Sequence, residues 1–416
     1  MTGDIFRKHR LSFVLTFGAF ALWGVGHRLY ETLVPEFAKV FELNSTELVV
    51  TQAVYGFVYL VLAVPAALYT RTFGSKAGFV FGLGAWGIGA FMFYPAALQH
   101  AFLFFVFAAV VMYGGYIFLE ISVNPVVARM GPPESAIRRL NFAHALYPVG
   151  VLGGLYVGRW VILSDLALPL EKLANAVVRP YMVIGVAVLV LAFIVDKAEF
   201  PALATERSGH RGAMQEVRTL FSQPMFVAAI AAQICGVAAR VGTWVLSGQY
   251  INVAMPGTTT LGAADFLLLS LILYGVGRFV GAILMFWFDP NRLLAIFAAS
   301  GLVLAGIATV FGGEIGVYAL VASSLSISIT YATILGSAIK DLGPMTKMGT
   351  ALIYIGGTGS TIGVALMHVV WTFTSIQLAM IVPMIGYAGV LVYALVLCKG
   401  PAARERVQVT APAHAA

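Results

Sequence analysis

Residues 101–130 read AFLFFVFAAVVMYGGYIFLEISVNPVVARM. This stretch is longer than the roughly 20 apolar residues that an α-helix needs to cross a bilayer, and Glu120 is its one acidic residue. A charged side chain at the centre of a membrane helix costs about 2.5–3.5 kcal/mol on insertion scales unless it is paired or hydrated. The stretch therefore predicts a transmembrane helix whose carboxyl group has a function.

The same apolar character runs through the whole chain. Of its 416 residues, 60% are hydrophobic and 10% are charged, whereas about 25% of the residues in soluble domains are charged. The apolar runs are too long and too uniform for β-barrel strands, which alternate over about ten residues. We expect an all-α membrane protein with twelve transmembrane helices, at residues 12–34, 46–70, 77–98, 101–130, 141–163, 181–195, 226–253, 263–288, 292–311, 317–339, 349–374 and 378–397.

The basic residues indicate the orientation of these helices. If the N-terminus is cytoplasmic, the loops on that side hold most of the lysines and arginines, and the opposite loops hold only Lys39, Lys172 and Arg179. Because Lys and Arg are enriched in cytoplasmic loops, we expect a multi-pass protein of the cell inner membrane with both termini in the cytoplasm. The net charge of +7 then follows from topology, and no nucleic-acid partner is expected.

A charged central segment and two recurring positions indicate a duplicated chain. Arg240 follows Arg28 by 212 positions (240 − 28), and Tyr331 follows Glu120 by 211 positions (331 − 120). Two halves of six helices are typical of transporters built from repeats. We expect an N-terminal six-helix bundle, a cytoplasmic linker, a C-terminal six-helix bundle and a cytoplasmic tail, at residues 1–195, 196–224, 225–398 and 399–416 respectively.

Polar side chains recur at helical spacing on several of the expected helices. Positions three, four and seven apart share a helix face, so Arg28 and Glu31 lie on one stripe with His27 at its border. Such stripes predict a hydrated cavity in the bundle. By this criterion its lining includes His27, Arg28, Glu31, Glu120, Asn141, His144, Gln233, Arg240 and Trp244.

Glu31 and Glu120 are the expected proton-coupling groups. A carboxyl group within the membrane can take up and release a proton as its surroundings change. Two other interpretations stay open. Arg28 and Glu31 would form an ion pair within one helix that only neutralises itself, and Glu120 would be held by tyrosine hydroxyls to fix helix packing.

Glycine motifs in the chain favour helix packing over cofactor binding. Residues 82–87, GLGAWG, fit G-x-G-x-x-G but lie inside an expected transmembrane helix with no preceding strand. Close helix contact explains them and residues 356–359, GGTG, better than a dinucleotide does. The chain contains no P-loop, H-E-x-x-H or C-x-x-C motif. We therefore expect no cofactor, no metal site and no enzymatic activity, and the proton is the expected coupling ion.

Several segments resemble a known family. Residues 21–25 (ALWGV) with 31–35 (ETLVP), residues 119–125 (LEISVNP) and residues 139–144 (RLNFAH) resemble helix motifs of the fucose:proton symporter family within the major facilitator superfamily. The resemblance implies the major facilitator fold, with two pseudo-symmetric six-helix bundles that work by alternating access. It also implies hexose import with protons, and it maps the family's two key acidic positions onto Glu31 and Glu120.

The chain departs from that family at the expected binding positions. His27, Arg28, His144 and Arg240 stand where the family carries amide side chains for sugar hydroxyls. Guanidinium groups bind carboxylate, sulfonate or phosphate groups in bidentate fashion. The sequence therefore leaves the substrate open between a neutral sugar and an organic anion.

The leading hypothesis is a proton-coupled importer, a symporter, that carries a small polar solute across the lipid bilayer as a monomer. Glu31 and Glu120 would couple the proton, and Tyr331 would complete the substrate pocket. A proton-driven exporter or drug antiporter is the alternative within the same fold. A membrane sensor that does not transport is the alternative from another class, and the absence of a sizeable soluble segment in the sequence disfavours it.

Overall fold

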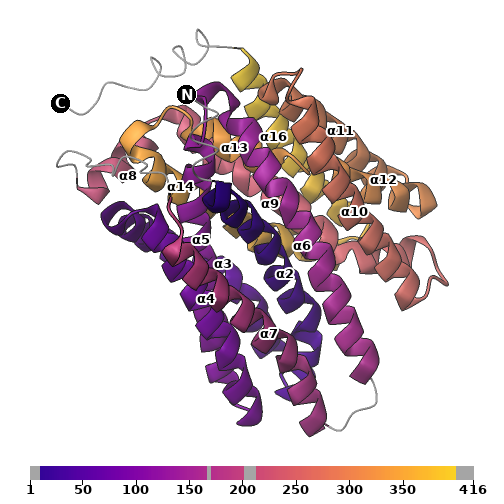
Figure 1. The fold of residues 1–416 in the computed structure, drawn as a ribbon. Coiled ribbons are helices and arrows are strands. Elements are labelled where there is room, and N and C mark those ends of the chain that lie inside the picture. Colours follow the sequence, from indigo (N-terminus) through magenta and orange to yellow (C-terminus); the bar gives the residue numbers. More distant parts are fainter. Residues whose placement is uncertain (1–9, 166–169, 201–211, 400–416) are drawn as a thin grey trace. The chain divides into compact units, whose positions relative to one another are not determined.

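The computed structural model describes residues 10–165, 170–200 and 212–399, and every regular element in these ranges is a helix (Figure 1). This confirms the predicted all-α class. The first half contains helices α2 (Arg10–Val40), α3 (Ser45–Phe73), α4 (Ser75–Leu98), α5 (Phe102–Arg129), α6 (Ala136–Asp165) and α7 (Leu170–Lys197), with the short 3-10 helix η1 (Pro133–Ser135) before α6.

The second half contains more, shorter helices. They are α8 (Ala213–Phe221), α9 (Pro224–Ala254), α10 (Thr260–Leu284), α11 (Pro290–Val310), α12 (Gly313–Ser326), α13 (Thr330–Ile339), η2 (Gly343–Met345), α14 (Thr346–Tyr354), η3 (Ile355–Thr358), α15 (Gly359–Phe373), η4 (Leu378–Met380) and α16 (Ile381–Cys398). The amphipathic helix α8 lies within the segment expected as a linker, with Leu220 buried and Met214 exposed.

Eleven helical segments in the described residues are long and apolar enough to cross a membrane. The remaining one of the twelve predicted segments is helix α2. Its 31 residues span about 46 Å at 1.5 Å per residue, so its length suffices. His27 and Arg28 lower the mean hydropathy of α2, and for this reason α2 is not among the eleven segments.

Residue contacts divide the chain into two compact units. The first unit is Met1–Pro132 with Leu146–Arg207, and the second unit is Pro133–Ala145 with Ser208–Ala416. The first turns of α6 are thus grouped with the second unit, which the sequence does not indicate. The domain limits that we expect at residues 195 and 225 stay predictions.

In the first unit, α4 packs along both α5 and α7, and α3 packs along α5 (Figure 1). Glycines make the α4–α5 approach possible. A Cβ atom on Gly82 would lie 2.7 Å from the backbone nitrogen of Leu119, whereas one on Gly84 would meet no atom within 4 Å. Since real Cβ contacts are not that short, Gly82 is required for close packing. The interpretation of residues 82–87 as a packing motif is confirmed.

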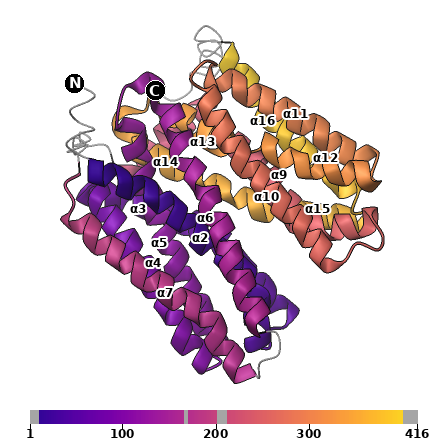
Figure 2. The ribbon, with the colours of Figure 1, turned by 45° about the vertical axis from the view of Figure 1, so that its right-hand side comes forward.

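In the second unit, α9 packs against α15 and α16, and α11 packs against α12 and α16 (Figure 2). Two of the spans that we expect to be continuous are broken here. The span at residues 317–339 breaks between α12 and α13, and the span at 349–374 passes through η3. Glycine disfavours the helix interior by about 1 kcal/mol relative to alanine, and η3 carries Gly356 and Gly357.

The break at η3 lets the chain approach α9. A Cβ atom on Gly356 would lie 2.5 Å from Cγ of Gln233, and one on Gly363 would lie 2.7 Å from Cα of Ala238. Glycines of residues 356–359 therefore pack closely against α9, as the sequence predicts. The same close approach places the backbone of Gly356 against one side of Gln233.

Candidate binding and proton-transfer residues

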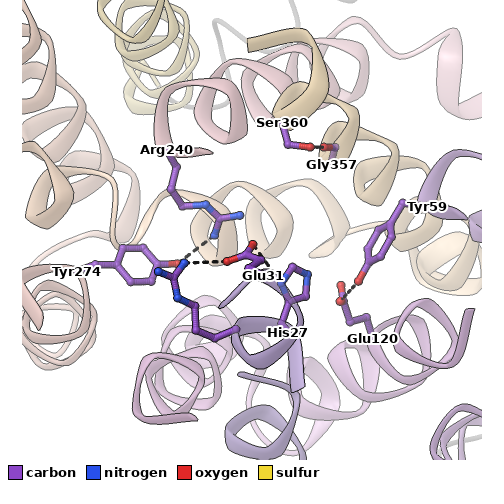
Figure 3. A network of polar contacts seen from close by, with 9 residues as sticks. His27, Glu31, Tyr59, Glu120, Arg240, Tyr274, Gly357 and Ser360 are labelled. Atoms are coloured by element: carbon purple, nitrogen blue, oxygen red, sulfur yellow. Dashed lines mark hydrogen bonds and ion pairs between the residues drawn. The ribbon is translucent and has the colours of Figure 1, made fainter. Parts of the chain in front are cut away.

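Three polar residues of α2 form one cluster in the first unit. Arg28 Nη1 donates to Glu31 Oε2 at 2.8 Å, and His27 Nδ1 lies 3.6 Å from Glu31 Oε1. The side chains of His27 and Arg28 are 11% and 13% exposed, whereas that of Glu31 is 49% exposed. The carboxylate thus lies between a guanidinium and an imidazole group, and Figure 3 shows His27 and Glu31 side by side. The ion pair that the sequence analysis raised as an alternative is present.

Aromatic rings surround His27. Its ring centroid lies 4.9 Å from that of Tyr55, 5.6 Å from that of Tyr113 and 5.9 Å from that of Tyr116. Tyr116 is fully buried, and its hydroxyl has no hydrogen-bond partner in the described part of the chain. Tyrosine combines an apolar ring with a polar tip. These rings therefore offer both apolar faces and a hydroxyl group beside the ionisable cluster.

Glu120 lies in α5 and is only 2% exposed. The hydroxyl of Tyr59 donates to Glu120 Oε1 (Figure 3), and Asn124 Nδ2 donates to the main-chain oxygen of Glu120 at 2.9 Å. A cavity of about 180 Å³ borders Glu120, and its other lining residues are Ala19, Phe20, Trp23, Leu119 and Val123. The carboxyl group is therefore buried, held by a tyrosine and next to a largely apolar cavity.

Tyr55 and Tyr59 connect these two places in the first unit. The ring centroids of Tyr55 and Tyr59 lie 4.4 Å apart, and Tyr55 also contacts His27. Tyr59 in turn donates to Glu120. One row of side chains thus leads from the Glu31 cluster to Glu120. The sequence analysis missed Tyr55 and Tyr59, which lie four apart on α3 in an otherwise apolar helix; that spacing was the available signal.

The second unit contains a small cavity. Three of the predicted binding residues line it. The lining consists of Gln233, Gly236, Val237, Arg240, Ile327, Thr330 and Tyr331.

Gln233 and Thr330 bring unused hydrogen-bonding groups to this cavity. Gln233 is 1% exposed, and neither its amide nitrogen nor its amide oxygen has a partner in the described part of the chain. The hydroxyl of Thr330 likewise has none there. A buried polar group left unsatisfied costs about 1–3 kcal/mol. Both side chains are therefore suited to hydrogen-bond the hydroxyl groups of a solute.

Arg240 is held against aromatic rings. Its Nη1 donates to the hydroxyl of Tyr274 at 3.1 Å (Figure 3), and its guanidinium carbon lies 5.8 Å from the ring centroid of Trp244 and 5.9 Å from that of Tyr331. Trp244 Nε1 donates to Ser324 Oγ at 3.1 Å, which fixes the indole. Arg240 thus lies near the rings of Trp244 and Tyr331, and Arg240 and Tyr331 also line the cavity.

Asn141 and His144 of α6 complete this group. Asn141 Nδ2 donates to Thr333 Oγ1 at 3.1 Å, and the His144 ring centroid lies 5.8 Å from that of Tyr331. The main-chain oxygen of His144 accepts a hydrogen bond from Arg278 Nη1 at 3.2 Å. Both predicted residues are buried. Asn141 is engaged with a helix of its own unit, which indicates a packing role in this conformation.

The sequence analysis did not select Tyr274 and Arg278, nor Thr330 of the cavity lining. Arg278 is 2% exposed and donates through Nη2 to the hydroxyl of Tyr274. The two residues are four apart on α10, and that spacing was the available signal. The prediction that residues of the two units line one common cavity stays a prediction.

Comparisons with known proteins agree with this architecture. The family model of the Major Facilitator Superfamily matches residues 11–368. The L-fucose-proton symporter of Escherichia coli (strain K12) is 29% identical over 410 residues, which cover 93% of both chains. The glucose/galactose transporter of Brucella abortus (strain 2308) is 28% identical over 392 residues, which cover 91% of this chain and 92% of the relative.

Solved structures show the same fold. The crystal structure of the transporter FucP in the outward conformation matches with a TM-score of 0.85 at 29% identity, covering 92% of this chain and 98% of that one. The proton:xylose symporter XylE bound to 6-bromo-6-deoxy-D-glucose matches with a TM-score of 0.75 at 11% identity, covering 96% of each chain. The predicted fold and the resemblance found in the sequence are both confirmed.

Proposed function

Since the chain belongs to the Major Facilitator Superfamily, we propose that it is a symporter that imports a small sugar together with protons. The observation that carries the proposal is Glu120, a buried carboxyl group in a membrane helix beside an apolar cavity. The named activities of relatives that match over most of their length, fucose–proton symport and glucose/galactose transport, support the same assignment.

Glu120 provides a physical basis for coupling. An ionised carboxylate is costly to keep in an apolar environment, whereas a protonated one is tolerated. Proton binding therefore lowers the free energy of conformations in which Glu120 is shielded from water. Release of the proton on the other side of the membrane favours conformations in which water reaches the carboxylate. The Tyr59 hydroxyl stabilises the carboxylate between these events.

Glu31 is the second proposed proton group. It is more exposed than Glu120 and has His27 and Arg28 as partners. His27 lies 3.6 Å from the Glu31 carboxylate and its ring contacts that of Tyr55, so His27 is placed to pass a proton between Glu31 and the row of Tyr55 and Tyr59. In the second unit, Gln233, Arg240, Trp244 and Tyr331 are the proposed contacts for the solute.

The remaining properties belong to the same proposal. Both termini lie in the cytoplasm, because that orientation places most of the basic loop residues inside. The protein works as a monomer in the lipid bilayer, needs no cofactor and catalyses no covalent reaction.

Replacement of Glu120 tests the coupling role. In vesicles with an imposed pH gradient, the wild type should accumulate sugar on the side toward which protons flow, because symport moves the sugar and the proton together. Glu120→Gln should abolish uphill uptake while sugar exchange without a gradient is retained, because the amide stays neutral throughout the cycle. Glu314→Gln, at an exposed carboxyl of α12, is the matched control and should leave uptake unchanged. Undiminished uphill uptake by Glu120→Gln would contradict the proposal, and sugar movement opposite to the proton flow would identify a proton-driven exporter.

A further inference from the structure

Two interruptions of membrane helices in the second unit lie against α9. One is η3, where a Cβ atom on Gly356 would be 2.5 Å from Cγ of Gln233. The other falls between α12 and α13, and there the N–H of Thr330 donates to the main-chain oxygen of Ile327 at 3.3 Å. That bond spans three residues, whereas the bonds of an α-helix span four. Interrupted helices are typical of the binding sites of transporters, because irregular backbone at membrane depth is tolerated only inside protein or beside a cavity.

A small cavity lies where these segments meet α9. Gln233 and Gly236 lie three apart on one face of α9, and both line the cavity together with Thr330. A Cβ atom on Gly236 would be 3.0 Å from Cγ2 of Thr330. The methyl group of Thr330 therefore packs against Gly236, and the hydroxyl group of Thr330 points in another direction. Gln233 and Thr330 are thus held at neighbouring places in the wall of one cavity.

Gln233 and Thr330 have hydrogen-bonding capacity that the described protein does not use. Gln233 is 1% exposed and Thr330 is 3% exposed. Among residues 10–165, 170–200 and 212–399, neither amide atom of Gln233 nor the hydroxyl group of Thr330 has a hydrogen-bond partner. Buried polar groups in native proteins are nearly always paired. Two such groups beside one cavity therefore indicate a ligand or a bound water.

The unused groups include both donors and acceptors. A carboxamide has two N–H donors and an acceptor oxygen, and a threonine hydroxyl group both donates and accepts. A hydroxyl group of a ligand matches both side chains, because it also donates and accepts. A carboxylate only accepts and an ammonium group only donates, so either would leave part of the pair unmatched. Since the cavity is small, it suits one hydroxyl group and not a whole sugar ring.

We propose that this cavity is the subsite for one hydroxyl group of the transported sugar, and that Gln233 and Thr330 determine specificity by binding that hydroxyl. The inference rests on the proposed function and adds the group of the substrate that the second unit recognises. A sugar without this hydroxyl leaves both side chains buried and unpaired. Sites built to bind a substrate hydroxyl reject the analogue that lacks it for this reason.

Monodeoxy sugars test the proposal. Binding of L-fucose, D-galactose and D-glucose to the purified full-length protein is measured by calorimetry, and the tightest binder becomes the parent sugar. Each of its monodeoxy analogues is then measured in the same way. At one ring position the deoxy analogue should bind about 10-fold or more weakly than the parent sugar. The deoxyfluoro analogue at that position cannot donate a hydrogen bond and should also bind more weakly than the parent sugar.

Variants assign this discrimination to the two side chains. Gln233→Leu and Thr330→Val should each weaken binding of the parent sugar by about 10-fold and change binding of the sensitive deoxy analogue by less than about 3-fold. Thr330→Ser keeps the hydroxyl group and should keep the discrimination. Thr309→Val is the matched control, because the buried hydroxyl of Thr309 donates to the main-chain oxygen of Ala305 at 2.8 Å, and it should change neither affinity. If Gln233→Leu does not fold, the pair of Thr330 variants decides.

Two results would overturn the inference. One is that every monodeoxy analogue binds wild type as tightly as the parent sugar. The other is that Gln233→Leu and Thr330→Val change the affinities of the parent sugar and of all analogues by one common factor, which would show that the pair holds a water and does not contact the sugar.

Uptake into vesicles separates these failures from a failure of the proposed function. Proton-driven uptake of the parent sugar without discrimination by Gln233 and Thr330 leaves the symporter assignment standing and removes the subsite. Discrimination in binding without proton-driven uptake removes the symporter assignment and leaves the subsite. If none of the three parent sugars binds, the sugar assignment fails and the subsite fails with it.

Discussion

Arg278 Nη1 donates to the main-chain oxygen of His144 at 3.2 Å, across 134 positions of sequence. In an α-helix this oxygen would accept from the backbone N–H four residues later, and that residue is Pro148, inside α6. Proline has no N–H. Because membrane helices must satisfy such freed carbonyl groups from within the protein, Arg278 supplies the hydrogen bond that Pro148 cannot.

This relationship predicts a coupling between the two positions. In Pro148→Ala the new N–H can donate to the His144 oxygen, so Arg278→Met should be less destabilising in that background by about 1 kcal/mol, the net value of one hydrogen bond. Thermal unfolding of the four proteins in detergent gives the double-mutant cycle. Pro180, inside α7, provides the control, since Arg278→Met with Pro180→Ala should show no coupling. Equal effects of Arg278→Met in both backgrounds would contradict the assignment.

Tyr59→Phe should uncouple the proton without removing the carboxyl group. The substitution deletes the hydroxyl that donates to Glu120 and keeps the buried ring. Hydrogen bonds to charged groups contribute about 1.5–3 kcal/mol, so formation of the Glu120 carboxylate becomes less favourable. Proton-driven uptake should fall by about 10-fold or more, while sugar exchange at equal pH should change little.

Tyr69→Phe is the matched control for this experiment, because Tyr69 also lies in α3 and its ring packs against Phe73, Phe81 and Phe118. Its uptake should equal that of wild type. A Tyr59→Phe protein with full uphill uptake would show that the tyrosine only packs.

Gln233→Leu should stabilise the protein and weaken sugar binding. Leucine removes an amide whose two polar atoms have no partner in the described part of the chain, and each unsatisfied group costs about 1–3 kcal/mol. Stability at the expense of binding is typical of functional sites. The melting temperature of the sugar-free protein should rise, and the stabilisation by sugar should shrink.

Gln99→Leu tests whether any added leucine would have this effect. Gln99 is exposed at the end of α4, so its replacement should leave the melting temperature and the sugar response unchanged. A lower melting temperature for Gln233→Leu would show that the amide stabilises the fold through bridging waters or a polar role of another kind.

Much of the fold follows from the apolar runs. The predicted helix at residues 101–130 corresponds to Phe102–Arg129, because an unbroken apolar run has sharp ends. The helix expected at residues 181–195 is longer, Leu170–Lys197, since its first turns carry charged residues that are unfavourable in a membrane span but compatible with a helix. The break in η3 contains two glycines, Gly356 and Gly357, whereas the break at residues 327–329 contains no glycine or proline that would mark it in the sequence.

The sequence predicted the polar stripe on a single helix of the candidate site but not the partners of that stripe on other helices. Helical spacing placed Gln233 and Arg240 on one stripe of α9, and both line the cavity. Spacing on one helix does not identify partners on another, so Tyr59 and Tyr274 were missed. In the sequence each is an ordinary aromatic residue of an apolar run. Only the fold shows that Tyr59 contacts Glu120 and that Tyr274 contacts Arg240.

Gly82 and Gly84 of the motif at residues 82–87 should respond to substitution in opposite directions. Gly82→Ala places a methyl group 2.7 Å from the backbone nitrogen of Leu119, and because backbone cannot move aside cheaply, the loss of stability should be about 1–3 kcal/mol. Gly84→Ala meets no atom within 4 Å and should stabilise by about 0.5–1 kcal/mol through helix propensity. Thermal unfolding of both variants measures the difference. If the motif bound a cofactor instead of packing α4 against α5, Gly82→Ala would leave the melting temperature of the ligand-free protein unchanged, and that result would refute the packing assignment.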